Sequence, residues 1–482
     1  MNYKSIGHFV ALIAAIEAVF LLPALLLALA FGEPQAVFPL LWTIGIALAL
    51  SGLLFLLTRG ARREFHEKEG LACVSLGWIV MSLIGCLPFF FSGKIPSFVD
   101  ALFESVSGFT TTGSTILSEV ASWPRSLLYW RSFTHWVGGM GVLVLLLALA
   151  PTGGQGFTMH LMRAESPGPS VGKLVPQIRK TARILYLIYF ALTLLETVLL
   201  LIARMPLFDA VCIAFGTAGT GGFGVTNGGL ADYSPAIQTI VGVFMFIFGV
   251  NFSCYYLILI GKIKNVLKDE EMRWYMAFSA IGIAVITFNI RAQYGTLGES
   301  LRHAFFQVGS IISTTGFATT DFNQWPLLSQ AILVFFMFTG ASAGSTCGGM
   351  KMSRVIMVLK NLRRNLRQII RPNRVSVVRV NKAAVDEGIL SNVNTYLACY
   401  VIILIVSFLL LAPDMPDMTS GFTAIVACFN NIGPGLNVVG PMGNFSGFSD
   451  FSKIVLIFDM LAGRLEIFPM LALFSTATWS HR

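Results

Sequence analysis

Apolar residues fill several uninterrupted stretches that are each long enough to cross a lipid bilayer as an α-helix. Such a helix needs about 20 residues, and apolar runs occupy residues 9–31, 36–58, 184–203, 236–260, 274–290 and 396–412. Of the 482 residues, 55% are hydrophobic and only 12% are charged, which excludes an ordinary soluble domain. The sequence therefore predicts an all-α polytopic membrane protein. With the shorter apolar segments included, we expect ten crossings.

Lysine and arginine gather in four segments between the apolar runs. Segments 59–70, 152–183, 261–273 and 351–390 hold 23 of the 33 Lys and Arg residues. Because cytoplasmic loops of membrane proteins are enriched in these residues, the positive-inside rule places all four segments and both termini in the cytoplasm. This topology accounts for most of the net charge of +9, so we expect no nucleic-acid partner.

A short pattern that ends in glycine occurs four times, in residues 100–113, 209–222, 303–316 and 420–433. Each copy has a small residue six positions before its final glycine, namely Ser107, Gly216, Ser310 and Ala427. The windows are too short and too polar at their ends to cross a bilayer. Each one therefore predicts a half-length helix followed by an extended Gly/Thr segment, which is the pattern of a re-entrant loop.

An apolar span precedes and follows each copy, and the later span opens near a turn signal. The signals are "SWPRS" at 122, "YSPAI" at 233, "QWPLL" at 324 and "GFSDF" at 447. We expect four span–re-entrant loop–span repeats around a central pore, plus an N-terminal two-helix hairpin. The expected boundaries are 1–70 for the hairpin, 71–151, 180–262 and 272–360 for repeats one to three, 361–389 for a basic cytoplasmic segment, and 390–482 for repeat four.

Four such loops around one axis would suit a cation. Irregular backbone at membrane depth is tolerated where it lines a cavity, and a ring of carbonyl and Thr oxygens can replace the hydration shell of an ion. Each short helix precedes its loop, so its partially negative C-terminal end faces the axis and favours a cation. Glu119, Asp232 and Asp321 could enrich cations at the mouth, or they could be ordinary solvated loop charges.

Six motifs resemble the Trk/Ktr/HKT superfamily of cation transporters, most closely the TrkH-type bacterial potassium uptake proteins. They are "FTTTGST" at 109, "GTGGFG" at 219, "STTGFATTDF" at 313, "NNIGPGLN" at 430, "HWVGGMGVLV" at 135 and "MLAGRLEIFPML" at 460. The resemblance implies a potassium-channel-like fold in the cell inner membrane, a bound potassium ion and a homodimer. It also implies a cytosolic TrkA-type regulatory subunit that binds NAD(H) and/or ATP/ADP, while this chain binds no nucleotide itself.

The resemblance also assigns a selectivity filter. Its glycines fall at Gly113, Gly222, Gly316 and Gly433, preceded by the carbonyls of Thr111, Thr112, Thr220, Gly221, Thr314, Thr315, Asn431 and Ile432. In the related plant transporters a serine at the first of these glycines goes with sodium transport, so four glycines favour potassium. The second and fourth loops depart from the Thr-rich pattern, and the filter is therefore not expected to be strictly fourfold.

The third repeat carries a stretch rich in glycine and small hydroxyl residues, "TGASAGSTCGGMK" at 339–351. Such residues make a poor uninterrupted helix, although a close-packed helix face is the alternative. We expect a non-helical intramembrane loop below the filter that acts as a gate. Its expected gating residues are Gly340, Gly344, Ser345, Gly348, Gly349 and Lys351.

Arg464 lies within the last apolar span, where an unpaired charge costs at least about 2.5–3.5 kcal/mol. Either it braces the short helices behind the filter, or it is a fixed positive charge that meets the loop of the third repeat. The resemblance favours the second interpretation. Glu466 is two residues further on and points elsewhere on a helix, so we do not expect the two to pair.

Two other classes of function are weighed against a pore. The six histidines form no recognisable ligand set and no nucleophile motif is present, so the sequence does not predict an enzyme. The match of residues 219–224 to G-x-G-x-x-G lacks the strand–turn–helix context of a dinucleotide site. A proton- or sodium-coupled secondary transporter remains an open alternative, because such proteins also use broken helices near the midplane.

Overall fold

The four predicted short helices all form, and each ends where its Gly/Thr segment begins. The computed structural model describes residues 2–60, 67–141, 178–373 and 376–479. The short helices are α5 (Phe98–Phe109), α10 (Leu207–Gly219), α15 (Leu297–Ile312) and α19 (Met418–Phe429). Three of them begin at a side-chain cap, since Ser97, Thr296 and Asp417 each accept a hydrogen bond from a backbone N–H in the first turn.

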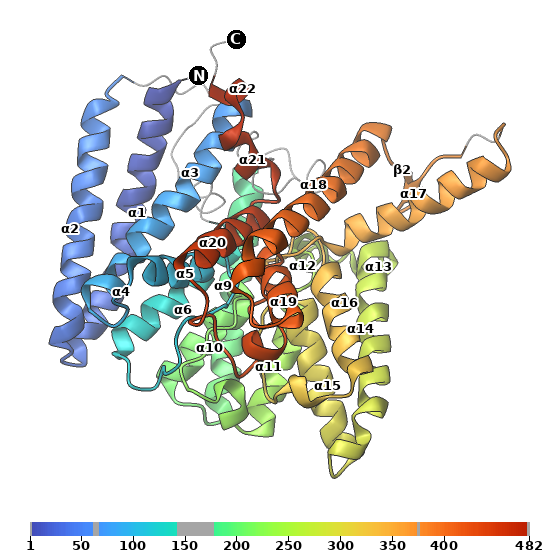
Figure 1. The fold of residues 1–482 in the computed structure, drawn as a ribbon, viewed down its shortest axis with the longest axis horizontal. Coiled ribbons are helices and arrows are strands. Elements are labelled where there is room, and N and C mark those ends of the chain that lie inside the picture. The colour runs from blue at the N-terminus through green and yellow to red at the C-terminus, as the bar shows by residue number, and fades with distance from the viewer. Residues whose placement is uncertain (1, 61–66, 142–177, 374–375, 480–482) are drawn as a thin grey trace.

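Long helices surround this group of short ones (Figure 1). An N-terminal pair, α1 (Tyr3–Ala30) and α2 (Pro34–Leu57), packs together at one side, as the sequence predicts. The first helices of the four repeats are α3 (Glu67–Gly85), α9 (Ile178–Ile202), α14 (Glu270–Asn289) and α18 (Glu387–Leu411). A five-residue helix, α4 (Leu87–Phe91), follows α3.

The second helices of the repeats are shorter than a full crossing. They are α6 (Arg125–Gly139), α11 (Pro235–Phe248), α16 (Leu327–Thr339) and α20 (Asp450–Arg464). All four begin at the predicted turn signals. Within the described residues, five helices are long and apolar enough to cross a membrane, or six if one bent pair counts as a single span. The sequence predicts ten crossings, and the second helices counted among them are too short as described to span a membrane alone.

The apolar run 236–260 is the bent pair. It was expected to form one span, but α11 and α12 (Phe252–Leu259) meet at 90°. Asn251 caps the new helix by accepting from the Ser253 N–H at 2.8 Å, and the Phe252 N–H donates to Gly344 O at 2.9 Å rather than to the preceding turn. A partner from another repeat therefore replaces the helical hydrogen bond.

The chain also turns sharply after α20. Arg464, expected inside the last apolar span, is the last residue of that helix. Glu466 and Ile467 take positive φ values of 56° and 69°, which a continuous helix cannot contain. Two short helices follow, α21 (Phe468–Phe474) and α22 (Thr476–Trp479).

The basic segments that the structure describes contain small elements. After α12 comes α13 (Ile263–Lys268), and after α16 comes α17 (Met352–Ile370), which projects away from the bundle (Figure 1). Two-residue strands β1 (Arg379–Val380) and β2 (Ala383–Ala384) pair antiparallel beyond it. The connections hold the 3-10 helices Gly229–Asp232, Arg291–Gln293, Phe322–Gln324, Ala412–Asp414 and Asn437–Val439. Most of segment 152–183 and the end of the first repeat, 142–151, lie outside the described residues.

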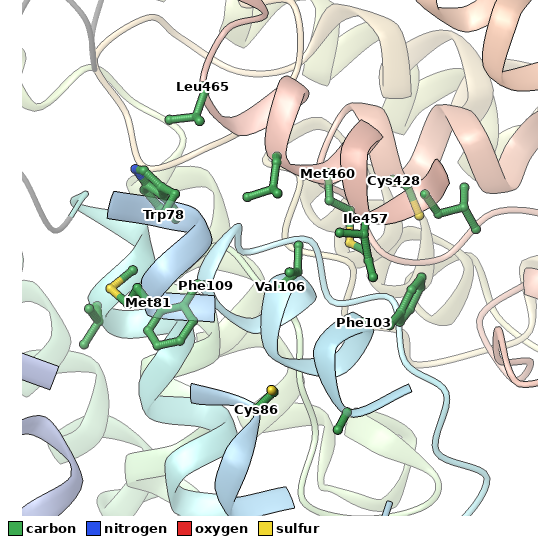
Figure 2. Packing of buried hydrophobic residues seen from close by; sticks show 14 of the residues in the cluster. Trp78, Met81, Cys86, Phe103, Val106, Phe109, Cys428, Ile457, Met460 and Leu465 are labelled. Atoms are coloured by element: carbon green, nitrogen blue, oxygen red, sulfur yellow. The ribbon is translucent and has the colours of Figure 1, made fainter. Parts of the chain in front are cut away.

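Repeat four closes against repeat one through a buried apolar seam. Figure 2 shows Phe103 and Val106 of α5 facing Cys428 of α19 and Ile457 of α20, and all belong to one buried cluster. The first and last described segments also meet, since the Tyr3 hydroxyl donates to Trp479 O at 3.3 Å and the two rings stack. The chain therefore closes into a ring rather than extending as a row of repeats.

Close approach of the short helices to the second helices requires glycine. A Cβ added to Gly138 in α6 would lie within 3.0 Å of Phe109 O at the end of α5. A Cβ on Gly463 in α20 would lie equally close to Phe429 O at the end of α19. Real Cβ atoms essentially never come that near a backbone oxygen. The second helix of repeats one and four therefore packs directly on the last carbonyl of its own short helix.

Alanine at Gly138 or Gly463 should lower the free energy of unfolding by about 1–3 kcal/mol, because the added methyl group overpacks a rigid contact. Gly45→Ala in α2 is the matched control, because a Cβ there meets nothing within 4 Å and alanine favours a helix. Thermal unfolding of the three purified variants measures the difference. Equal midpoints for all three would contradict the close approach.

Candidate functional site

The four Gly/Thr segments share one backbone conformation. In each segment an amide N–H just past the short helix donates to a carbonyl five residues earlier, which caps the helix end. The four bonds are Thr112 N to Ser107 O (2.9 Å), Gly221 N to Gly216 O (2.8 Å), Thr315 N to Ser310 O (2.8 Å) and Ile432 N to Ala427 O (2.9 Å). The small residues found six positions before each glycine in the sequence are thus the acceptors that end the four helices.

The same two positions of each segment take positive φ. Thr111, Thr220, Thr314 and Asn431 have φ of 53°, 56°, 56° and 54°, and Gly113, Gly222, Gly316 and Gly433 have φ of 79°, 80°, 83° and 99°. A left-handed conformation costs roughly 1–2 kcal/mol for a residue with a Cβ, and a threonine in it is an outlier. Such strain persists only where the surroundings impose it, and it concentrates at functional sites.

The four glycines meet around a common centre. A Cβ added to Gly113 would lie within 3.0 Å of Gly221 O, and one added to Gly222 within 3.0 Å of Thr315 O. In the same way, a Cβ added to Gly316 would lie within 3.0 Å of Ile432 O, and one added to Gly433 would lie 2.8 Å from Thr112 O. Each loop therefore touches the next, and the fourth returns to the first. This closed ring is the arrangement that the sequence repeat predicts.

A cavity of about 170 Å³ opens directly above the ring, and all four glycines line it. None of the acidic residues proposed for its mouth takes part in the lining. Asp232 accepts from the Gly228 N–H and Asp321 caps its own turn at the Asn323 N–H, so these two carboxylates serve local turns. Among the described lining residues, Arg131 is the one charged side chain.

Side chains support the four segments in different ways. In loop one the Thr110 and Thr112 hydroxyls are 2.7 Å apart, and in loop three Ser313 and Thr315 repeat this pair at 2.7 Å. In loop four the Asn431 amide donates instead to the Thr112 hydroxyl at 2.9 Å and to Met460 O at 2.9 Å. The backbone is therefore close to fourfold and the side chains are not, as the departures in loops two and four predict.

Residues 340–351 form the predicted non-helical loop, so the alternative of one continuous helix is wrong. Left-handed φ values occur at Gly340 (60°), Gly344 (71°), Gly349 (75°) and Lys351 (72°). The Gly348 N–H donates to the Thr314 hydroxyl at 2.8 Å, which places the loop directly against the Gly/Thr segment of repeat three. We call residues 340–351 the intramembrane loop.

The polar backbone of the intramembrane loop is satisfied by other repeats and by itself. Ser342 N donates to Gly249 O at 3.1 Å, which is at the break between α11 and α12. The Ser345 hydroxyl donates to Ser342 O at 2.6 Å, and the buried Lys351 ammonium group donates to Cys347 O. Two irregular segments at membrane depth therefore satisfy each other, as a low-dielectric environment requires.

Arg464 bridges the intramembrane loop to repeat one. Its Nη1 donates to Thr346 O at 2.7 Å, and its Nη2 donates to Gly139 O at 2.7 Å and to Gly138 O. These two carbonyls end α6, where the helix dipole favours a positive charge. Arg464 thus contacts the loop of the third repeat, as one of the two sequence-based interpretations expects, and its other contacts are with the second helix of repeat one rather than with a short helix. Glu466 pairs with Arg354 at the start of α17, and not with Arg464.

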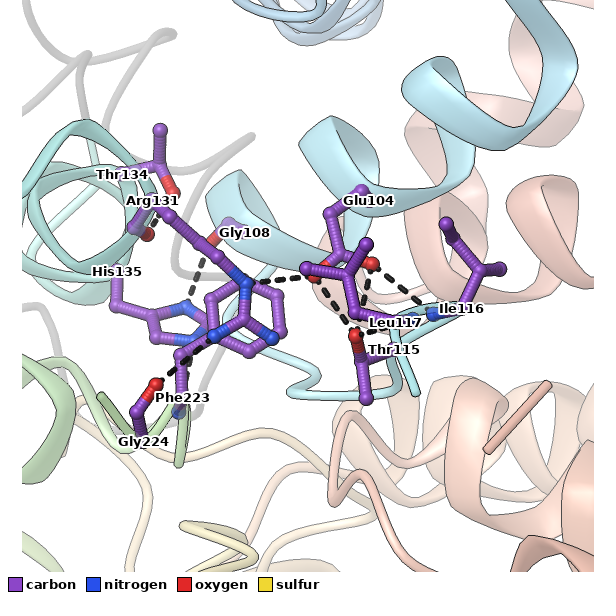
Figure 3. Close-up of polar contacts among 10 residues, drawn as sticks. All are labelled: Glu104, Gly108, Thr115, Ile116, Leu117, Arg131, Thr134, His135, Phe223 and Gly224. Atoms are coloured by element: carbon purple, nitrogen blue, oxygen red, sulfur yellow. Dashed lines mark hydrogen bonds and ion pairs between the residues drawn. The ribbon is translucent and has the colours of Figure 1, made fainter. Parts of the chain in front are cut away.

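Sequence reasoning missed three polar residues that hold the site together. Glu271 of α14 accepts from Ala343 N at 2.7 Å and Ser353 N at 3.0 Å, and so holds both ends of the loop. Figure 3 shows the other two, Glu104 and Arg131, whose Oε1 and Nε atoms are 2.6 Å apart and buried. An ionisable residue inside an apolar window is the signal that could have identified Glu104.

The ion pair of Glu104 and Arg131 joins two of the Gly/Thr segments. Glu104 accepts from the Thr115 hydroxyl at 2.9 Å and from the Ile116 N–H at 3.1 Å, just after the first glycine. Arg131 donates from Nη1 to Gly224 O at 3.1 Å, just after the second glycine. A pair that is both buried and hydrogen-bonded is costly to break from one side, so it anchors the parts of loops one and two that follow their glycines.

Comparison with known proteins identifies relatives over nearly the whole chain. Residues 40–481 match the family model of TrkH, a cation transport protein. The chain is 37% identical over 444 residues to the Trk system potassium uptake protein TrkH of Salmonella typhimurium, covering 91% of both chains. It is 34% identical over 488 residues to the protein of the same name from Vibrio parahaemolyticus, covering 99% of this chain and 100% of the relative. The crystal structure of the potassium transporter TrkH from Vibrio parahaemolyticus is similar over 100% of both chains, with a TM-score of 0.90 and 32% identity.

Proposed function

The chain belongs to the TrkH family of cation transport proteins, and we propose from this that it takes up potassium across the bacterial inner membrane through the ring of four loops. The observation that carries the proposal is the closure of that ring, in which Gly113, Gly222, Gly316 and Gly433 each face a carbonyl oxygen of the next loop. Related chains over the same length are named potassium uptake proteins. In this proposal the ion that passes through the ring is the transported substrate.

Backbone oxygens supply the proposed ion sites. They belong to Thr111, Thr112, Gly113, Thr220, Gly221, Gly222, Thr314, Thr315, Gly316, Asn431, Ile432 and Gly433. Four short helices end immediately before these residues, and each helix end carries roughly half a negative charge. Neutral carbonyl dipoles can replace the hydration shell of a monovalent ion and still release it, which a cluster of carboxylates would not do as readily.

We assign the intramembrane loop as the gate of the pore. It contacts the filter segment at Thr314, and Arg464 ties it to the end of α6, so it lies where it can obstruct the path of an ion. A fixed positive charge below the filter also repels cations. Opening then requires the loop to leave Thr314 and Arg464, and its positive-φ glycines allow the backbone to rearrange.

The helix α17 provides a mechanical link from the cytoplasm to this gate. It begins at Met352, directly after the loop, and Glu271 holds an amide of the loop and an amide of α17 together. The helix carries five basic residues, all of them before its C-terminal end. We propose that the protein acts as a homodimer and that a TrkA-type cytosolic subunit, which binds NAD(H) and/or ATP/ADP, moves α17. Both termini are then cytoplasmic.

Coupled transport driven by protons or sodium is the alternative, and it predicts a different current. In a passive pore the current through the reconstituted protein should reverse at the potassium equilibrium potential, whatever proton or sodium gradient is imposed. In a coupled transporter the reversal potential should shift when either gradient changes at constant potassium. Planar-bilayer or vesicle flux measurements at controlled potential decide between the two.

Serine at Gly113 should reduce the ratio of potassium to sodium uptake by about tenfold or more, since a side chain at this position displaces loop one from Gly221 O. Gly93→Ser is the matched control, because Gly93 also has a left-handed φ, 70°, but a Cβ there meets nothing within 4 Å. Radioactive tracer uptake by cells that lack other potassium systems measures the ratio. An unchanged ratio in the Gly113→Ser variant would count against the assigned filter.

Shortening the intramembrane loop by residues 343–345 should raise the ion flux per folded molecule, because the obstruction becomes smaller. Arg464→Ala should also raise it, by about tenfold, since hydrogen bonds from a charged donor contribute roughly 1.5–3 kcal/mol. Arg464→Lys, which keeps the charge but not the forked geometry, should lie in between. If Arg464→Ala lowers only the folded yield and leaves the flux per molecule unchanged, the residue braces the structure and does not gate it.

A further inference from the structure

Loop two differs from the other three at one position, where it has no side chain. The residue just before the filter glycine is Thr112 in loop one, Thr315 in loop three and Ile432 in loop four, but Gly221 in loop two. Gly221 does not have a positive φ, unlike the glycine that follows it. Its backbone conformation would therefore accept a side chain, and the reason for glycine must be sought in its surroundings.

The ring of His135 occupies the space of the missing side chain. A Cβ added to Gly221 would lie within 3.0 Å of the Nδ1, Cγ and Cε1 atoms of this imidazole. His135 comes from α6 of repeat one and is fully buried. In loop two, a side chain from the neighbouring repeat thus occupies this position. In each of the other three loops, a side chain of the loop itself is present there.

Both ring nitrogens of His135 have a backbone partner (Figure 3). The Phe223 N–H, two residues after Gly221, donates to Nε2 at 3.3 Å. Because Nε2 accepts, the proton must lie on Nδ1, which is 2.7 Å from Gly108 O and donates to it. The imidazole therefore connects the end of the short helix of repeat one to the filter segment of repeat two.

Arg131 reinforces the same contact from one helical turn away. The guanidinium lies 3.4 Å from the centre of the Phe223 ring and donates to Gly224 O at 3.1 Å. The centre of the His135 ring lies 4.1 Å from the centre of the same phenyl ring, so Phe223 contacts both side chains. Residues four apart on a helix share a face, and α6 therefore presents one continuous surface to loop two.

The internal repeat shows that this surface is special to repeat one. Each second helix can be aligned on its N-cap, which is Pro124, Ser234, Pro326 or Ser449. Eleven residues after the cap, repeat one has His135 and the other repeats have Met245, Met337 and Met460. Seven residues after it, repeat one has Arg131 and the others have Val241, Leu333 and Leu456. Histidine thus replaces methionine in the one repeat that packs on a loop with glycine at the facing position.

From this complementarity we infer that His135 is a positioning residue of the filter, paired with Gly221, and that it holds loop two in its ion-selective geometry. The inference rests on the proposed function, since it concerns the ion discrimination of the same ring. A flexible glycine with nothing beside it would leave its carbonyl free to reorient. The imidazole prevents this by filling the space and by binding the Phe223 N–H two residues further on.

Transplanting the pair found in the other repeats tests this inference. His135→Met removes the ring, and Gly221→Thr introduces a clash. The double variant places at this contact the residue types of the equivalent positions one repeat further on, Met245 of repeat two and Thr315 of loop three. We expect His135→Met to lower the ratio of potassium to sodium uptake by about tenfold, and Gly221→Thr to lower both the ratio and the folded yield. The double variant should recover the ratio to within about threefold of the unchanged protein. Tyr129→Phe, on the same helix but packed on Phe133 and Phe215, is the control and should change nothing.

Two outcomes would overturn the inference. One is an unchanged ratio in His135→Met at normal folded yield, and the other is a double variant no better than the worse single variant. The thermal unfolding midpoints of the four purified proteins give the same double-mutant cycle without any transport measurement. If the unchanged protein itself fails to prefer potassium, the proposed function is wrong, while additive changes in the midpoint would show separately that the two residues are not coupled.

Discussion

The structure depends on one constraint, which is that no backbone amide or carbonyl group can be left unpaired at membrane depth. Each filter segment meets it by returning an N–H to a carbonyl five residues back, so the irregular backbone is anchored to its own short helix. The break between α11 and α12 meets it differently, by exchanging hydrogen bonds with the intramembrane loop through Gly249 and Gly344. Irregular segments are stable here because they occur in mutually satisfying sets.

Fourfold geometry in the backbone is combined with three different kinds of side-chain support. Loops one and three use paired hydroxyls, loop four uses the amide of Asn431, and loop two relies on side chains from α6. A single chain can do this because its repeats are free to diverge, whereas four identical subunits could not. As a consequence of this divergence, loop two is stable only while repeat one is correctly folded beside it.

The proposed filter and the proposed gate share atoms. The Thr314 hydroxyl belongs to a filter segment and accepts from the intramembrane loop, and the carbonyls that end α6 accept from Arg464. The same α6 carries His135 and Arg131 to loop two. A displacement of the loop would therefore act on a helix that also contacts loop two, so α6 connects the proposed gate to the proposed filter.

The sequence by itself determined the four short helices, the glycines at their ends, the non-helical loop and the start of each second helix. These features follow from local rules on helix length, turn residues and backbone freedom. Each local signal is weak alone, but its recurrence in four repeats makes the prediction strong. Only the tertiary structure decided where the second helices break, that Arg464 ends its helix, and that Glu104, Arg131, Glu271 and His135 belong to the site. Some of their partners are far away along the chain, 93 residues for Arg131 and Gly224 and 326 residues for Arg464 and Gly138. Contacts of that kind depend on how the helices pack against one another, and no periodic pattern in a single sequence predicts them.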